Sequence, residues 1–192
     1  MKSREYYLNL LHTHIKNPKM IAHSLAAEAV MRALARKFGE DEDVWGLAGL
    51  LHDIDVEWTE ADPLRHGPEG AAFLQKHDIP AEVTEAIRLH NEHAAEGELR
   101  STRLHHALAA GETITGLIFA VALVYPDKKI SSVKPKSITK RMKEKLFAAS
   151  VSRENIRECE DIGIPLPEFA QLALEALAPI EEQLGFISSV SE

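Results

Sequence analysis

The sequence has little cysteine and no long apolar run. Its single cysteine, Cys159, excludes an internal disulfide framework and indicates a reducing compartment. The most apolar stretch, residues 113–125, is shorter than the ~20 residues that a membrane-spanning helix needs. Residues 1–7 carry charges with no apolar signal core behind them. We therefore expect a cytoplasmic protein with no membrane partner.

The sequence also lacks an excess of positive charge. The net charge of −8 argues against general nucleic-acid binding. Repeats, low-complexity tracts and convincing β-alternation are absent as well. Hydrophobic residues make up 45% and charged residues 27%, which is ordinary for a globular protein, and 192 residues can bury a substantial core. The sequence predicts one all-α domain and leaves the oligomeric state open, a homo-oligomer included.

Apolar residues at helical spacing, separated by caps and prolines, predict helices along the whole chain. We expect these helices over residues 3–16, 19–38, 44–52, 68–74, 80–90, 102–124, 139–149, 153–162 and 167–184, with an irregular basic stretch before Ser137. The single domain then divides into an N-terminal helix packed on it (1–18), a metal-binding core (19–126) and a basic loop with closing helices (127–187).

One apolar run ends in a pair of metal-ligand residues. Residues 45–51 are apolar or glycine and lead directly into His52-Asp53, an imidazole and a carboxylate that suit a borderline divalent ion. The dipeptide recurs at His77-Asp78, but polar residues and Pro80 flank it there, which is typical of an exposed turn. Gly46 and Gly49 are costly inside a helix, so we expect them to permit close packing against another helix.

A histidine upstream and an acid downstream complete the pattern. His23 lies on the apolar face of one predicted helix, and Glu112 lies in a second, strongly apolar one. In this order, His23, His52-Asp53 and Glu112 resemble the HD-domain superfamily of metal-dependent phosphohydrolases, and in particular its small HDIG-type members. The resemblance covers most of the chain and implies a multi-helix HD-type bundle. The family usually has Asp as its last ligand, where this sequence has Glu112.

The resemblance also implies the ligands and the ions. His23, His52, Asp53 and Glu112 would bind one divalent ion, with Mn, Fe, Co, Ni or Mg suited to mixed imidazole and carboxylate ligation. Binuclear members carry two added histidines, and His66 and His90 match that arrangement. Asp53 would then bridge two ions. The alternatives for His66 and His90 are contact with substrate or metal-bound water, and a packing or capping role.

Three acids and a basic cluster are candidates for the chemistry. We take Asp53, Asp55 and Glu57 as catalytic candidates. Asp55 and Glu57 could position water or protonate a leaving oxygen, and the alternative is that these two are surface acids. Positive charge near a transferred phosphoryl group aids the reaction, so we predict substrate contacts from a basic cluster, whose alternative is a solvated face: Lys134, Lys136, Lys140 and Arg141.

We therefore predict a metal-dependent phosphohydrolase acting on a small phosphorylated molecule such as a nucleotide. Two other functions fit the same residues. A few HD-type proteins hold a di-iron centre and oxidise their substrates, and abundant histidine is compatible with that. Glu112 in place of Asp also permits a non-catalytic protein that binds a metal or a nucleotide.

Overall fold

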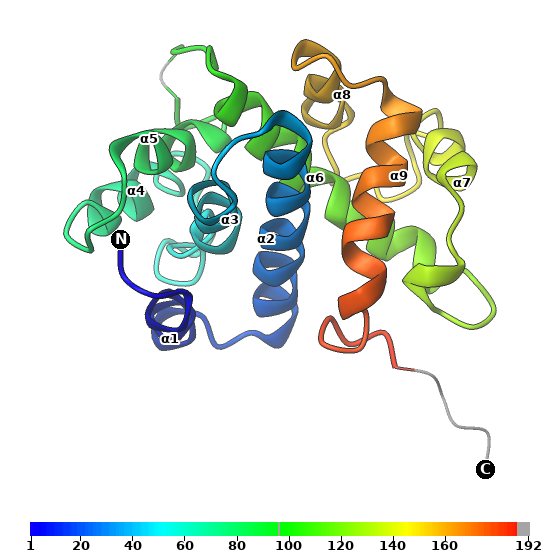
Figure 1. Ribbon diagram of the computed structural model, residues 1–192, viewed down its shortest axis with the longest axis horizontal. Coiled ribbons are helices and arrows are strands. Elements are labelled where there is room, and N and C mark those ends of the chain that lie inside the picture. Colours follow the sequence, from blue (N-terminus) through cyan, green and yellow to red (C-terminus); the bar gives the residue numbers. More distant parts are fainter. Residues whose placement is uncertain (96, 188–192) are drawn as a thin grey trace.

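The computed structural model describes residues 1–95 and 97–187, and this part of the chain forms helices and turns without a strand (Figure 1). The prediction of an all-α, single-domain bundle is confirmed. The α-helices are α1 (Arg4–His14), α2 (Pro18–Phe38), α3 (Glu42–Leu51), α4 (Pro68–Leu74), α5 (Ala81–His90), α6 (Arg103–Leu123), α7 (Pro135–Arg141), α8 (Arg153–Asp161) and α9 (Leu166–Leu177). Two short 3-10 helices, η1 (Ile130–Ser132) and η2 (Ala178–Ile180), complete the described elements.

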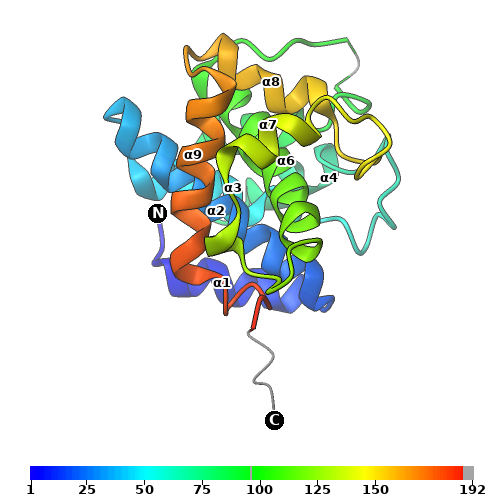
Figure 2. The same cartoon turned by 90° about the vertical axis from the view of Figure 1, so that its right-hand side faces the viewer.

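The bundle is built around α2 and α6. Figure 1 shows α2 between α3 and α9, with α6 crossing behind it. In the turned view of Figure 2, α7 and α9 lie side by side on the outside of α6. The helices α2, α3 and α6, which carry the residues of interest, therefore pack directly on one another.

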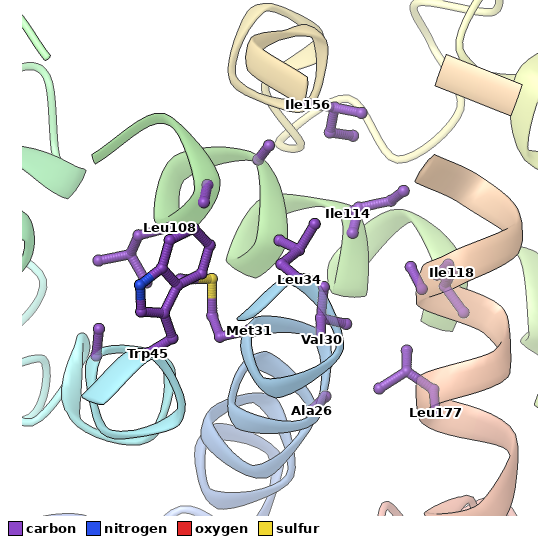
Figure 3. Packing of buried hydrophobic residues seen from close by; sticks show 14 of the residues in the cluster. Ala26, Val30, Met31, Leu34, Trp45, Leu108, Ile114, Ile118, Ile156 and Leu177 are labelled. Atoms are coloured by element: carbon purple, nitrogen blue, oxygen red, sulfur yellow. The ribbon is translucent and has the colours of Figure 1, made fainter. Parts of the chain in front are cut away.

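A continuous apolar core joins these helices. Trp45, Met31 and Leu108 lie together where α3, α2 and α6 meet, and Leu34 and Ile114 extend the contact along α2 and α6 (Figure 3). All five are buried. Because each such side chain contributes roughly 1.5–3 kcal/mol when it is removed from water, this packing fixes the relative positions of the three helices.

Gly49 allows α3 to lie unusually close to α2. A Cβ atom at this position would be 2.6 Å from the carbonyl carbon and oxygen of Ala27 on α2. Such a distance is not tolerated, so only glycine permits this approach. At Gly46, a Cβ atom would meet the Arg32 side chain at 2.7 Å. The expected role of both glycines in helix packing is confirmed, and α2 is the partner.

The ends of the first two helices are closed by side-chain caps and a glycine. Ser3 Oγ accepts a hydrogen bond from the backbone N–H of Tyr6, and Asn17 Oδ1 accepts one from Lys19. Gly39 ends α2 with φ 71°, the left-handed conformation that glycine adopts at lowest cost.

Two predicted helices near the C-terminus were wrong in their bounds. The helix expected over residues 139–149 begins at Pro135, which is acceptable at a first helical position, and it ends at Arg141. Residues 142–151 form turns instead, and Arg153 donates from Nη1 to the carbonyl oxygens of Ala148 and Val151 at 2.7 Å each. The last α-helix ends at Leu177 rather than at residue 184, because Pro179 interrupts it.

Among the described helices, α6 has the length and composition to cross a membrane. Its most apolar window has a mean hydropathy of 1.5, but 67% of that window is buried inside the protein. Its burial matches the prediction of a core helix.

Candidate metal centre

The structure brings all six predicted metal ligands together, although they come from different elements. They are His23 on α2, His52 at the C-terminal end of α3, Asp53 directly after it, His66 just before α4, His90 as the last residue of α5, and Glu112 on α6. The packing of the helices, together with the turns that follow α3 and precede α4, therefore assembles the cluster.

The six residues form two groups that could each hold a metal ion. In the first group, His23 Nε2 lies 3.0 Å from His52 Nε2 and 3.7 Å from Glu112 Oε2. In the second group, His66 Nε2 lies 3.1 Å from His90 Nε2. Within each group the ligand atoms lie within 4.8 Å of one another.

Asp53 contacts both groups. Its Oδ2 lies 3.5 Å from His23 Nε2, and its Oδ1 lies 3.4 Å from His52 Nε2. The same Oδ1 lies 3.1 Å from His66 Nε2 and 3.4 Å from His90 Nε2. A carboxylate so placed could ligate ions in both groups.

Each histidine ring has an acceptor at its other nitrogen. His52 Nδ1 donates to the carbonyl oxygen of Gly49 at 2.8 Å, and His90 Nδ1 donates to that of Ile87 at 2.6 Å. His23 Nδ1 donates to Thr115 Oγ1 at 2.9 Å, because the hydroxyl hydrogen of that threonine is already given to the Glu112 carbonyl.

These partners leave the Nε2 lone pairs of the rings facing one another across the cluster. Neutral rings in this arrangement repel each other, so a cation, either a proton or a metal ion, must lie between them. Four imidazoles and two carboxylates are the donors that divalent Mn, Fe, Co or Ni accept. The donor set therefore fits a divalent metal site of one or two ions.

The electrostatics of the metal-free cluster agree with this requirement. Burial, together with the neighbouring His52, lowers the pKa of His23 to about 4. Burial alone would also lower the pKa of His66, but its hydrogen bonds to Asp53 and Asp55 outweigh burial and raise the pKa to about 10. Burial raises the pKa of Glu112 to about 7. Without a metal, protons supply the positive charge that the cluster needs.

Asp55, which the sequence predicts to be catalytic, contacts a histidine of the cluster from behind. Its side chain is fully buried, and its Oδ1 accepts a hydrogen bond from His66 Nδ1 at 2.7 Å. Its Oδ2 accepts the backbone N–H groups of Gly67 and Gly70 at 2.8 Å each. Asp55 thus orients the His66 ring and holds the start of α4 in place, which is typical of a carboxylate that supports a metal-ligating histidine.

Glu57, the third acid predicted to be catalytic, does not line the cavity and makes its contacts elsewhere. Its Oε1 accepts the backbone N–H groups of Lys16 at 2.8 Å and Asn17 at 2.7 Å. These contacts fasten the junction between α1 and α2. Of the three acids that the sequence proposed for the chemistry, only Asp53 reaches the cluster.

The predicted basic cluster does not reach the site either. Lys134, Lys136 and Lys140 are exposed, and Arg141 packs over the Phe147 ring at 4.2 Å. None of the four lines the cavity above the metal cluster. The inward positions of α7 belong to apolar residues such as Ile138, which leaves the charged side chains on the outer face.

A cavity of about 330 Å³ opens over the metal cluster. Outside the cluster it is lined by Asn91, Glu92, His93, Thr113, Gly116, Ser150, Val151, Ser152 and Asn155. The sequence interpretation did not place these residues in the site. Thr115, which fixes the His23 ring, was missed too, although a polar residue three positions after Glu112 on an apolar helix was a usable signal.

Comparisons with known proteins agree with this geometry. The HD domain family model matches residues 20–122, so the chain belongs to the HD domain family. Ribonuclease Y of Sulfurovum sp. (strain NBC37-1) is 27% identical over 143 residues, which are 74% of this chain and 25% of that protein. The chain thus spans about a quarter of that relative's length. No solved structure matches the chain significantly.

Proposed function

We propose that the protein is a metal-dependent phosphohydrolase that acts on a small phosphorylated molecule such as a nucleotide. One observation carries the proposal: the Nε2 atoms of His23, His52, His66 and His90 converge with Asp53 at the base of an open cavity. Membership of the HD domain family supports a metal-dependent hydrolase as the class of enzyme.

The reaction would be the hydrolysis of a phosphate ester. A bond forms between the water oxygen and phosphorus, the bond between phosphorus and the ester oxygen breaks, and a proton from the water ends on the alcohol that leaves. A divalent ion, when bound, lowers the pKa of water and neutralises charge on the phosphoryl group. Asp53 and the four histidines would hold the ion, and Asp55 would keep His66 in the orientation that ligation needs.

A di-iron oxygenase is the second candidate. The two groups of potential ligands that share Asp53 would also suit two iron ions. Metal analysis separates the candidates, because two irons per chain with an optical signature would favour the oxygenase.

RNA is an additional substrate to test, because the relative from Sulfurovum is named a ribonuclease. The small cavity and the net charge of −8 favour a small molecule over a long polyanion. A short single-stranded RNA therefore belongs in the substrate panel.

The test measures phosphate release by the protein loaded with Mn²⁺ or Co²⁺ on phosphomonoesters, nucleotides and the RNA. We expect turnover of small phosphate esters, and we expect His23→Ala to abolish it. Glu112→Ala should lower both metal content and activity, and unchanged values would remove Glu112 from the ligands. A metal-loaded protein that hydrolyses none of these compounds would refute the proposal and favour a non-catalytic binding protein.

A further inference from the structure

The cavity above the metal cluster has an unusual charge pattern for a phosphate site. Among the described residues, no lysine or arginine lines it, and the undescribed residues 96 and 188–192 include neither. Its charged side chains outside the histidines are carboxylates: Asp53, Glu92 and Glu112. Positive charge that compensates a phosphoryl group there must therefore come from bound metal ions or from protonated histidines. This suits one phosphoryl group, whereas a polyphosphate would place further negative charge against Glu92.

Arg100, which contacts Glu92 of this wall, is fully engaged. Arg100 donates from Nε to the carbonyl oxygen of Leu89 at 3.0 Å and from Nη2 to that of His90 at 2.5 Å, and it forms an ion pair with Glu158. Its side chain is only 10% exposed. Arg100 holds the chain after α5 in place and is not free to bind a phosphate.

Glu92, whose side chain is 49% exposed, presents an oriented acceptor to the open cavity. Arg100 Nη2 at 3.1 Å and Asn155 Nδ2 at 3.2 Å both donate to its Oε2. Among the described residues, no other side chain donates to this carboxylate. Burial would raise the pKa of Glu92, but hydrogen bonds that include these two lower it, so the group is ionised at neutral pH. An ionised acceptor binds hydroxyl or amino groups.

The other polar groups of this wall are largely satisfied within the protein. Asn91 Nδ2 donates to the carbonyl oxygens of Pro63 and His66, and its Oδ1 accepts the backbone N–H of His93. Ser152 Oγ accepts the backbone N–H of Asn155. Glu92 is therefore the ionised acceptor of this wall, beside the ring of His93 and the hydroxyl of Ser150. The cavity volume of about 330 Å³ lies at the low end for ligand sites and suits a small molecule.

We propose that the substrate is a small phosphomonoester whose alcohol part carries additional hydroxyl groups, and that Glu92 accepts a hydrogen bond from one of these hydroxyls. The inference rests on the proposed function and specifies the substrate class of the same site. The phosphoryl group lies at the metal cluster, and the hydroxylated part lies against Glu92, held in its orientation by Asn155 and Arg100. Sugar phosphates and nucleoside monophosphates have this chemistry.

Glu92→Gln tests the inference sharply. The amide oxygen takes the position that receives the Arg100 and Asn155 hydrogen bonds, so the NH₂ group replaces Oε1 and turns an acceptor into a donor. The measured quantity is the specificity ratio, defined as kcat/KM for a hydroxylated monoester such as ribose 5-phosphate divided by kcat/KM for p-nitrophenyl phosphate, which has no further hydroxyl. We expect this ratio to fall about 10- to 100-fold in Glu92→Gln, because a charge-assisted hydrogen bond is lost.

Two further variants make the result decisive. In Asn155→Ala, Glu92 loses one of the two donors that orient it, whereas the backbone N–H that Ser152 caps is kept. The specificity ratio should therefore fall, as in Glu92→Gln. Glu98→Gln is the matched control, because Glu98 pairs with Arg88 at 2.6 Å outside this cavity, and its ratio should equal that of the wild type.

The outcomes distinguish the two proposals. An unchanged ratio in Glu92→Gln, or a preference of the wild type for ATP over monoesters, overturns the inference on the substrate and leaves the phosphohydrolase standing. If the metal-loaded wild type hydrolyses no phosphate ester at all, both proposals fail.

Discussion

The Nε2 atoms of His23 and His52 lie 3.0 Å apart, and the Nδ1 hydrogens of both rings are donated to other acceptors. Only a cation relieves the repulsion between two lone pairs at this distance. His66 and His90 repeat the relationship at 3.1 Å. Two pairs of buried or half-buried imidazoles therefore lie in an arrangement that is stable only with a proton or a metal ion between the rings.

Metal removal should destabilise the protein. An ion that binds the folded chain adds about 2.7 kcal/mol of stability at a concentration a hundredfold above its Kd. For a chain of this size, we expect the melting temperature of the metal-free protein to lie about 5–10 °C below that of the loaded protein. Thermal unfolding in Mn²⁺ and in chelator measures this shift, and His23→Ala, as the control, should show little of it. Equal melting temperatures for the wild type in Mn²⁺ and in chelator would show that the folded protein does not bind the ion.

Metal affinity should rise with pH. In the metal-free protein the pKa of His66 is raised to about 10, because its hydrogen bonds to Asp53 and Asp55 outweigh burial, so this ring holds a proton below that pH. The ion must displace the proton, and higher pH weakens the competition. We expect the apparent Kd for Mn²⁺ to fall about tenfold per pH unit between pH 6 and 8 for each proton released. Titration calorimetry in buffers of different ionisation enthalpy counts these protons, and a pH-independent affinity would count against His66 as a ligand.

Asp55→Asn should weaken metal binding without touching the metal. An asparagine offers one acceptor oxygen where Asp55 accepts three hydrogen bonds, and its NH₂ group would face donors. We expect a 10- to 100-fold loss of metal affinity, the usual cost of removing a partner of a ligating histidine. Glu57→Gln is the matched control, since its oxygen can still accept at the junction of α1 and α2. Equal affinities in both variants would show that Asp55 does not orient His66.

Gly49→Ala should disrupt the cluster by separating α2 from α3. Its Cβ atom would meet the Ala27 backbone at 2.6 Å, so the helices must shift. We expect a loss of about 1–3 kcal/mol, the usual cost of overpacking, measured by denaturant unfolding, together with weaker metal binding because His23 and His52 move apart. Gly39→Ala, with no neighbouring atom within 4 Å, should lose stability through its left-handed φ but retain metal affinity. Wild-type affinity in Gly49→Ala would show that this helix contact does not set the ligand distance.

The main helices and the residues of the ligand cluster could be predicted from the sequence. Apolar periodicity placed α2, α3 and α6, and the apolar context separated His52-Asp53 from His77-Asp78. The second pair indeed lies on a surface turn, with Asp78 at φ 57°. That six residues meet in space followed from their family resemblance rather than from periodicity, because spacing along the chain does not encode the packing of separate helices.

The remainder depended on tertiary contacts that leave no local pattern. Glu92 and Asn155 are 63 positions apart, and only the packed structure shows that they touch. Asp55 and Glu57 look alike in sequence, yet one faces the His66 ring and the other caps a helix junction. A run of lysines in the sequence indicates a charged segment but does not show which way the side chains point. In the structure, the lysines of α7 lie on the surface.

The metal content of the purified protein tests the central claim most directly, with two variants for comparison. After loading with Mn²⁺ and removal of free ion, elemental analysis should find one or two ions per chain in the wild type. Asp53→Ala should lose most of them, because Asp53 contacts both groups, whereas Asp78→Ala, in the surface copy of the same dipeptide, should retain them all. A wild type that binds no divalent ion, or an Asp53→Ala protein that binds as many as Asp78→Ala, would contradict the account.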